Sequence, residues 1–146
     1  MTAMADVARQ TITINASPEH CFAVVTDFAK YPEWAPDVKE AIVRSSDEQG
    51  RATEVEFRAS ALGRSTHYTL HYDHAEAPGR LTWKLVRGDI MRAIDGGYTF
   101  TAVAAGTQVD YDLSIELVVP LPGFVKRRAE VRILNTVKEL KARAEA

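Results

Sequence analysis

The chain has 146 residues, of which 46% are hydrophobic and 26% are charged, so we expect one globular domain over residues 1–146. Its formal net charge of −2 argues against a nucleic-acid partner, because proteins that bind nucleic acids carry a clear basic excess. No apolar run approaches the roughly 18 residues that cross a bilayer, which leaves peripheral contact as the one kind of membrane contact that we expect.

The first predicted elements are a strand and a short helix. Threonine alternates with isoleucine within residues 7–15, which indicates a strand. Ser17-Pro18-Glu19 then has the residues of a helix start, since serine caps the helix, proline fits its first turn and glutamate suits the positive end of its dipole. Pro32 and Pro36 disfavour a continued helix, so one or two short helices are expected here.

Residues 38–118 alternate between apolar and polar types in short runs. Turn residues separate these runs at 47–50, 62–64, 78–79 and 105–106. This pattern is typical of an antiparallel meander with one apolar face and one wet face. Together with the first strand, the runs predict a seven-stranded antiparallel sheet.

The period becomes that of a helix after the Pro-Leu-Pro-Gly run at 120–123. The broad apolar face of this helix holds Phe124, Val131, Leu134 and Val137, and Ile133 and Leu140 lie at its edge. No helix-breaking residue follows, so the helix is expected to reach about 30 Å. The fold class is therefore α+β, with a curved sheet wrapped around a long C-terminal helix.

A sheet that bends around one helix encloses more space than the helix fills, so we expect an apolar binding cavity between them. Tyrosines suit such a cavity because they combine an apolar ring with a hydroxyl that can orient a ligand. The expected lining consists of the inward aromatic residues, namely Phe57, Tyr68, Tyr72, Trp83, Tyr98, Phe100 and Tyr111. The alternative, that these residues only form the core of the sheet, stays open.

Several motifs resemble the polyketide cyclase/dehydrase branch of the START-like superfamily, which also includes coenzyme Q-binding proteins. In residues 25–34 (VTDFAKYPEW), an aspartate and an aromatic residue precede tyrosine-proline-x-tryptophan, as in the family pattern. Residues 95–100 and 106–111 also fit, and the resemblance covers nearly the whole chain. It implies the helix-grip fold, in which the sheet grips the C-terminal helix over a deep cavity, and it places Tyr31 and Trp34 near the cavity mouth.

The resemblance implies three kinds of function. Relatives carry lipids or coenzyme Q, cyclise polyketide chains, or act as ribosome-association toxins. Aromatase/cyclase relatives generally have an inward arginine late in the strand before residues 78–79, where this chain has Tyr68, Leu70 and Tyr72. We therefore expect a carrier or binding protein for a lipid, isoprenoid or polyketide-like molecule, without a cofactor. A cyclase/aromatase/dehydratase-type enzyme and a protein-interaction module remain as alternatives, and the sequence identifies neither catalytic residues nor the oligomeric state.

Three charged residues are further candidates for the cavity. Arg127 and Glu130 fall inside the apolar arc of the last helix, three positions apart, so they either form a polar pair in the cavity or extend from the helix edge into solvent. Arg92 shares its parity with Tyr98 unless a bulge intervenes, and the glycines at 96–97 favour a bulge.

We expect no metal site. His67 and His71 are four residues apart in a strand, which separates them by about 13 Å, too far to share one ion. Together with His74, they are expected on the wet face of the sheet, along with Thr69. Cys21 lies on an apolar helix and is expected to be a buried structural thiol, and a single cysteine permits no internal disulfide, which favours the cytoplasm.

Overall fold

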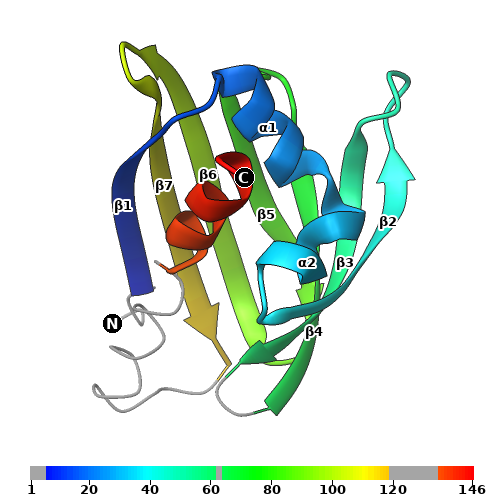
Figure 1. Ribbon diagram of the computed structural model, residues 1–146. Coiled ribbons are helices and arrows are strands. Elements are labelled where there is room, and N and C mark those ends of the chain that lie inside the picture. The colour runs from blue at the N-terminus through cyan, green and yellow to red at the C-terminus, as the bar shows by residue number, and fades with distance from the viewer. Residues whose placement is uncertain (1–5, 62–63, 119–134) are drawn as a thin grey trace.

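The frame of the protein is a curved seven-stranded antiparallel sheet with the strand order β1-β7-β6-β5-β4-β3-β2 (Figure 1). The computed structural model describes residues 6–61, 64–118 and 135–146. The strands are β1 (Asp6–Ile14), β2 (Val38–Ser46), β3 (Ala52–Ala61), β4 (Arg64–Asp73), β5 (Arg80–Gly88), β6 (Met91–Val103) and β7 (Gly106–Leu117). From β2 to β7 each strand pairs with the next in the chain, and β1 closes against β7. The predicted meander is therefore confirmed.

The chain between β1 and β2 forms α1 (Pro18–Thr26), a 3-10 turn η1 (Phe28–Lys30) and α2 (Tyr31–Trp34). The predicted helix start is confirmed, since the side chain of Ser17 accepts a hydrogen bond of 3.1 Å from the backbone N–H of His20. Pro18 occupies the first turn, where a missing N–H costs nothing.

Residues 135–144 form the described part of the C-terminal helix, which lies on the same face of the sheet as α1 (Figure 1). Val137 and Leu140 are fully buried and Ala144 nearly so, which gives this segment one apolar stripe. Leu140, expected at the edge of the apolar face, is as fully buried as Val137. Phe124, Arg127, Glu130 and Val131, like Ile133 and Leu134, lie outside the described residues.

Polar contacts attach the end of this helix to the elements around it. The Nζ of Lys141 donates to the carbonyl of Thr13 at 2.9 Å, and the carboxylate of Glu145 accepts from the backbone N–H of Asn15 at 2.8 Å. Arg143 donates to Glu33 at 3.0 Å. These contacts fix the helix relative to the end of β1 and to α2.

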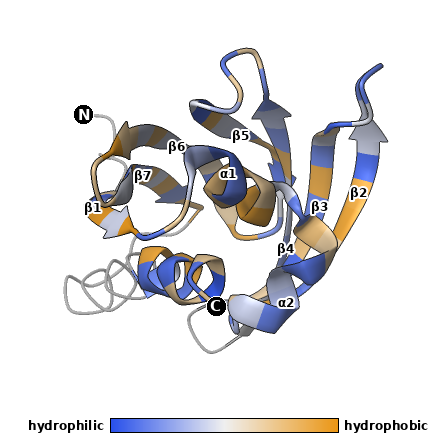
Figure 2. Cartoon of the chain, turned by 45° about the horizontal axis from the view of Figure 1, so that its top comes forward, coloured by the Kyte–Doolittle hydropathy of each residue, from blue (hydrophilic) through white to orange (hydrophobic). Residues whose placement is uncertain are grey.

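The tightest part of the core lies under α1. Figure 2 shows the hydrophobic positions of α1 and of the C-terminal helix turned toward the sheet. The side chains with no accessible surface there include those of Ile14, Cys21, Val25, Leu81, Val109, Val137 and Leu140. Cys21 is thus the buried thiol that the sequence predicts, and burial raises its pKa.

The Ser17 cap gives a test of how local sequence supports the fold. Ser17→Ala removes the acceptor for the His20 N–H and should lower the free energy of unfolding by about 1 kcal/mol, measured by urea denaturation. Ser45→Ala, at an exposed position of β2, is the matched control. Equal effects of the two substitutions would contradict a capping role.

Candidate functional site

The inward side chains of β5 and β7 become slightly more exposed with distance from α1. Along β7 the exposed fraction rises from 0% at Val109 to 6% at Tyr111 and 9% at Leu113, and along β5 it rises from 0% at Leu81 to 7% at Trp83. Beyond these positions the inward side chains are only partly buried, namely Leu85, Ile115 and Leu117. Along β5 and β7 the packing is therefore tightest at the α1 end, although Thr66 of β4 and Met91 of β6, toward the other end of the sheet, are buried as well.

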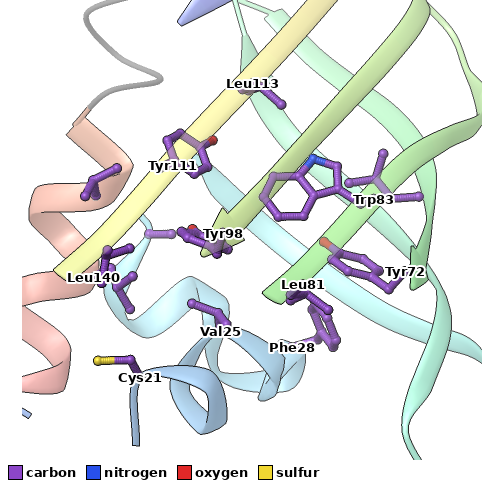
Figure 3. Close-up of a cluster of buried hydrophobic side chains, with 14 of the residues drawn as sticks. Cys21, Val25, Phe28, Tyr72, Leu81, Trp83, Tyr98, Tyr111, Leu113 and Leu140 are labelled. Carbon is purple, nitrogen blue, oxygen red and sulfur yellow. The ribbon is translucent and has the colours of Figure 1, made fainter. Parts of the chain in front are cut away.

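Seven aromatic side chains cross this face from β3 to β7, and we call them the aromatic belt: Phe57, Tyr68, Tyr72, Trp83, Tyr98, Phe100 and Tyr111. They are the residues that the alternation predicts, and Figure 3 shows Tyr72, Trp83, Tyr98 and Tyr111 turned toward one interior region. Neighbouring rings touch across the strands, with centroid distances of 5.4 Å for Phe57–Tyr68, 5.8 Å for Tyr72–Trp83 and 4.9 Å for Tyr98–Tyr111. The ring contacts form two groups, one of Phe57 and Tyr68 and the other of the remaining five rings.

Phe28 of η1 joins these two groups into one continuous surface, although the sequence analysis did not name it as a site residue. Its ring lies 4.7 Å from that of Tyr72 and 6.2 Å from that of Phe57. The signal was available, because Phe28 is the aromatic residue that follows the aspartate in the family motif.

The phenols of the belt are uncharged at neutral pH. Burial raises the pKa of Tyr68 to about 12, and it raises the pKa values of Tyr72, Tyr98 and Tyr111 well above the ordinary value. The neighbouring phenols raise the pKa values of Tyr72, Tyr98 and Tyr111 further. These phenols are neutral groups that can donate to, or accept from, the oxygen atoms of a ligand.

Acidic and basic side chains are absent from the buried set of the described residues, which includes no Asp, Glu, Lys or Arg. His74 is buried, so its expected place on the wet face is wrong. Its parity matches that of Tyr72, and its ring lies edge-on to Phe22 with a centroid distance of 6.2 Å. Its Nε2 donates to the carbonyl of Ala52 at 2.5 Å, whereas the buried Nδ1 has no partner. Thr69, also expected on the wet face, is buried as well.

Tyr31 and Trp34 lie beside the belt rather than in its centre. The hydroxyl of Tyr31 donates to the carbonyl of Val25, and its ring contacts Phe57 at 6.0 Å. Trp34 is 8% exposed and packs on Tyr31 at 4.9 Å. It also lines a hollow of about 410 Å³ between α1, α2 and the end of the C-terminal helix, together with His20, Lys30 and Arg143. Contact of Tyr31 and Trp34 with a ligand stays a prediction.

Arg92 points away from the belt, because the bulge in β6 occurs earlier than the sequence predicts. The register shifts between Met91 and Ala93, and Arg92 is exposed with its guanidinium 3.4 Å from the carboxylate of Glu116. Gly96 and Gly97, where the bulge was expected, are in regular register with both neighbouring strands. The two glycines therefore do not form the bulge.

The family and the fold are known from other proteins. The family model described as polyketide cyclase / dehydrase and lipid transport matches residues 5–145. A START superfamily protein from Mycobacterium smegmatis is 23% identical, with a TM-score of 0.87 over 95% of this chain and 97% of that chain. The Zhui aromatase/cyclase from Streptomyces sp. R1128 is 13% identical, with a TM-score of 0.80 over 97% of this chain and 94% of that chain. No curated protein matches the chain.

Plant proteins have the same fold. Ginseng major latex-like protein 151 from Panax ginseng is 12% identical, with a TM-score of 0.72 over 97% of this chain and 99% of that chain. The sheet and the helices on its concave face define a helix-grip protein of the START-like superfamily. The chain belongs to the polyketide cyclase/dehydrase and lipid transport family within it. Within the described residues, no helix is both long and apolar enough to cross a membrane.

Alkaline titration tests the state of the phenols. Because the folded chain raises the pKa of Tyr68 from 10.0 to about 12, the folded state holds this proton more tightly than the unfolded state does. The resulting stability is complete below pH 10 and is lost as the pH rises through about 12. We expect the ultraviolet absorbance of tyrosinate to appear together with the loss of the circular dichroism signal. Tyrosinate forming near pH 10 in a chain with unchanged dichroism would contradict the burial of these groups.

Proposed function

We propose that the protein binds an apolar small molecule, such as a lipid, an isoprenoid or a polyketide-like compound, between the aromatic belt and the C-terminal helix, as a carrier or binding protein. The observation that carries this proposal is the belt itself, a largely buried aromatic surface that Phe28 makes continuous. Its rings offer apolar area, and its neutral phenols offer hydrogen bonds that cost no buried charge. The family description, which includes lipid transport, supports the same conclusion.

An enzyme of the cyclase/aromatase/dehydratase type is the alternative, because the fold also occurs in the Zhui aromatase/cyclase. Such catalysis needs an acid or base of suitable pKa within reach of the substrate. The phenols of the belt hold their protons far above neutral pH, and the described inward positions late in β4 hold Tyr68, Leu70 and Tyr72 rather than an arginine. These features favour binding over catalysis. No feature of the described residues favours a protein-interaction module.

Native mass spectrometry of the purified protein tests binding directly. We expect either a copurified apolar molecule or the uptake of one fatty acid per chain from a mixed panel of fatty acids, isoprenoid alcohols and polycyclic phenols. A chain that takes up none of them would rule out a carrier.

The position of the ligand can be tested with a brominated lipid, because bromine quenches tryptophan fluorescence on contact. The chain has two tryptophans, so Trp34→Phe leaves only Trp83, in the belt, and Trp83→Phe leaves only Trp34. We expect dibromostearic acid to quench Trp83 strongly and Trp34 weakly, with stearic acid as the control for both variants. Stronger quenching of Trp34 would place the ligand at the hollow beside α2 instead.

A further inference from the structure

Trp83 and Gly96 are direct partners on β5 and β6. A Cβ atom built on Gly96 would lie 2.6 Å from three adjoining atoms of the indole of Trp83, namely Nε1, Cε2 and Cζ2. Nonbonded carbon atoms pack at about 3.5–4.0 Å, so no residue with a side chain fits at position 96 while the indole keeps its place. The indole therefore lies directly on the backbone of Gly96.

The neighbouring Gly97 serves the other face of the sheet. A Cβ there would lie 3.1 Å from the guanidinium of Arg80 and 3.3 Å from both the carbonyl of Leu81 and the side chain of Thr82. Because successive residues of a strand point to opposite faces, only Gly96 affects the aromatic belt.

Trp83 is the centre of the belt, so the distance of its indole from the backbone of the sheet affects the positions of the neighbouring rings. Its ring contacts Tyr72 at 5.8 Å, Tyr98 at 5.3 Å and Tyr111 at 6.1 Å, so it touches rings from three other strands. A methyl group at position 96 would have to lift the indole by about 1 Å to reach ordinary contact. Because close-packed rings transmit such a shift, the rings around Trp83 would also move away from the sheet, and the space between the belt and the C-terminal helix would become shallower.

We propose that Gly96 is a specificity-determining residue. By letting the indole of Trp83 lie on the bare backbone, it sets the depth of the concave face, so that the site accepts a ligand as broad as a fused ring system and not only a single extended chain. This inference rests on the proposed function, since it concerns the same site.

The same pair of residues also stabilises the sheet, because a cross-strand aromatic ring covers the backbone that a glycine leaves exposed. A loss of stability in a Gly96 variant would therefore say nothing about specificity. The informative quantity is the ratio of two dissociation constants, because partial destabilisation changes both constants in the same direction.

The experiment compares a broad probe with a slim one. N-phenyl-1-naphthylamine carries a fused ring, trans-parinaric acid is a linear polyene, and both report binding by fluorescence. We expect Gly96→Ala to weaken the binding of the broad probe, relative to the slim one, about tenfold, because overpacking removes room that only the broad probe needs. Gly97→Ala, which adds the same methyl group on the opposite face, should change the ratio by less than about twofold.

Trp83→Phe gives a second arm, which does not require the Gly96→Ala chain to fold. A smaller ring at position 83 makes the concave face deeper, so the ratio of dissociation constants should shift in favour of the broad probe. Adding Trp83→Phe to Gly96→Ala should restore the wild-type ratio. An unchanged ratio in Trp83→Phe, or equal ratios in Gly96→Ala and Gly97→Ala, would overturn the role of Gly96. A wild-type chain that binds neither probe would overturn this inference, whereas the proposed function is overturned only by a chain that also takes up no member of the mass-spectrometric panel.

Discussion

The structure depends on one constraint, which is that seven strands present their apolar side chains on a single face and that this face has to be covered. The described helical segments all lie on that face. They close it completely where β1 ends and where β5 and β7 begin, as the inaccessible side chains of Ile14, Leu81 and Val109 show. Toward the other end of β5 and β7, the side chains of Leu85, Ile115 and Leu117 are only partly buried.

Apolar burial and polar contacts have different tasks in this covering. Fully burying a valine or leucine contributes about 1.5–3 kcal/mol, so Val137 and Leu140 supply most of the stabilisation that the described helix segment gains. A surface ion pair such as that between Arg143 and Glu33 is worth about 0–1 kcal/mol. This ion pair and the hydrogen bond from Lys141 to Thr13 instead determine the position of the helix, because they can form in only one placement of the helix on the sheet.

The chemistry of the interior separates two functions that the fold itself does not separate. Phenols are the polar groups that the described belt offers, and their raised pKa values leave them as neutral donors and acceptors. The buried histidine, His74, lies beside Phe22 under α1, at the closed end of the core. This arrangement supports the proposed binding of an apolar molecule that carries a few oxygen atoms over the cyclase alternative.

The sequence by itself determined the strands, the capped helix at Ser17 and the inward parity of the aromatic belt, because alternation and capping depend on residues close together in the chain. His74 was misplaced although its parity with Tyr72 was visible, since the change from sheet to turn hides whether the alternation continues. The position of the bulge beside Arg92 and the purpose of Gly96 were decided only by the tertiary structure. A glycine in a strand indicates close approach, but only the register between β5 and β6 shows that Trp83 is what approaches. Register depends on which strands meet and how they align, and no local pattern of residues records that.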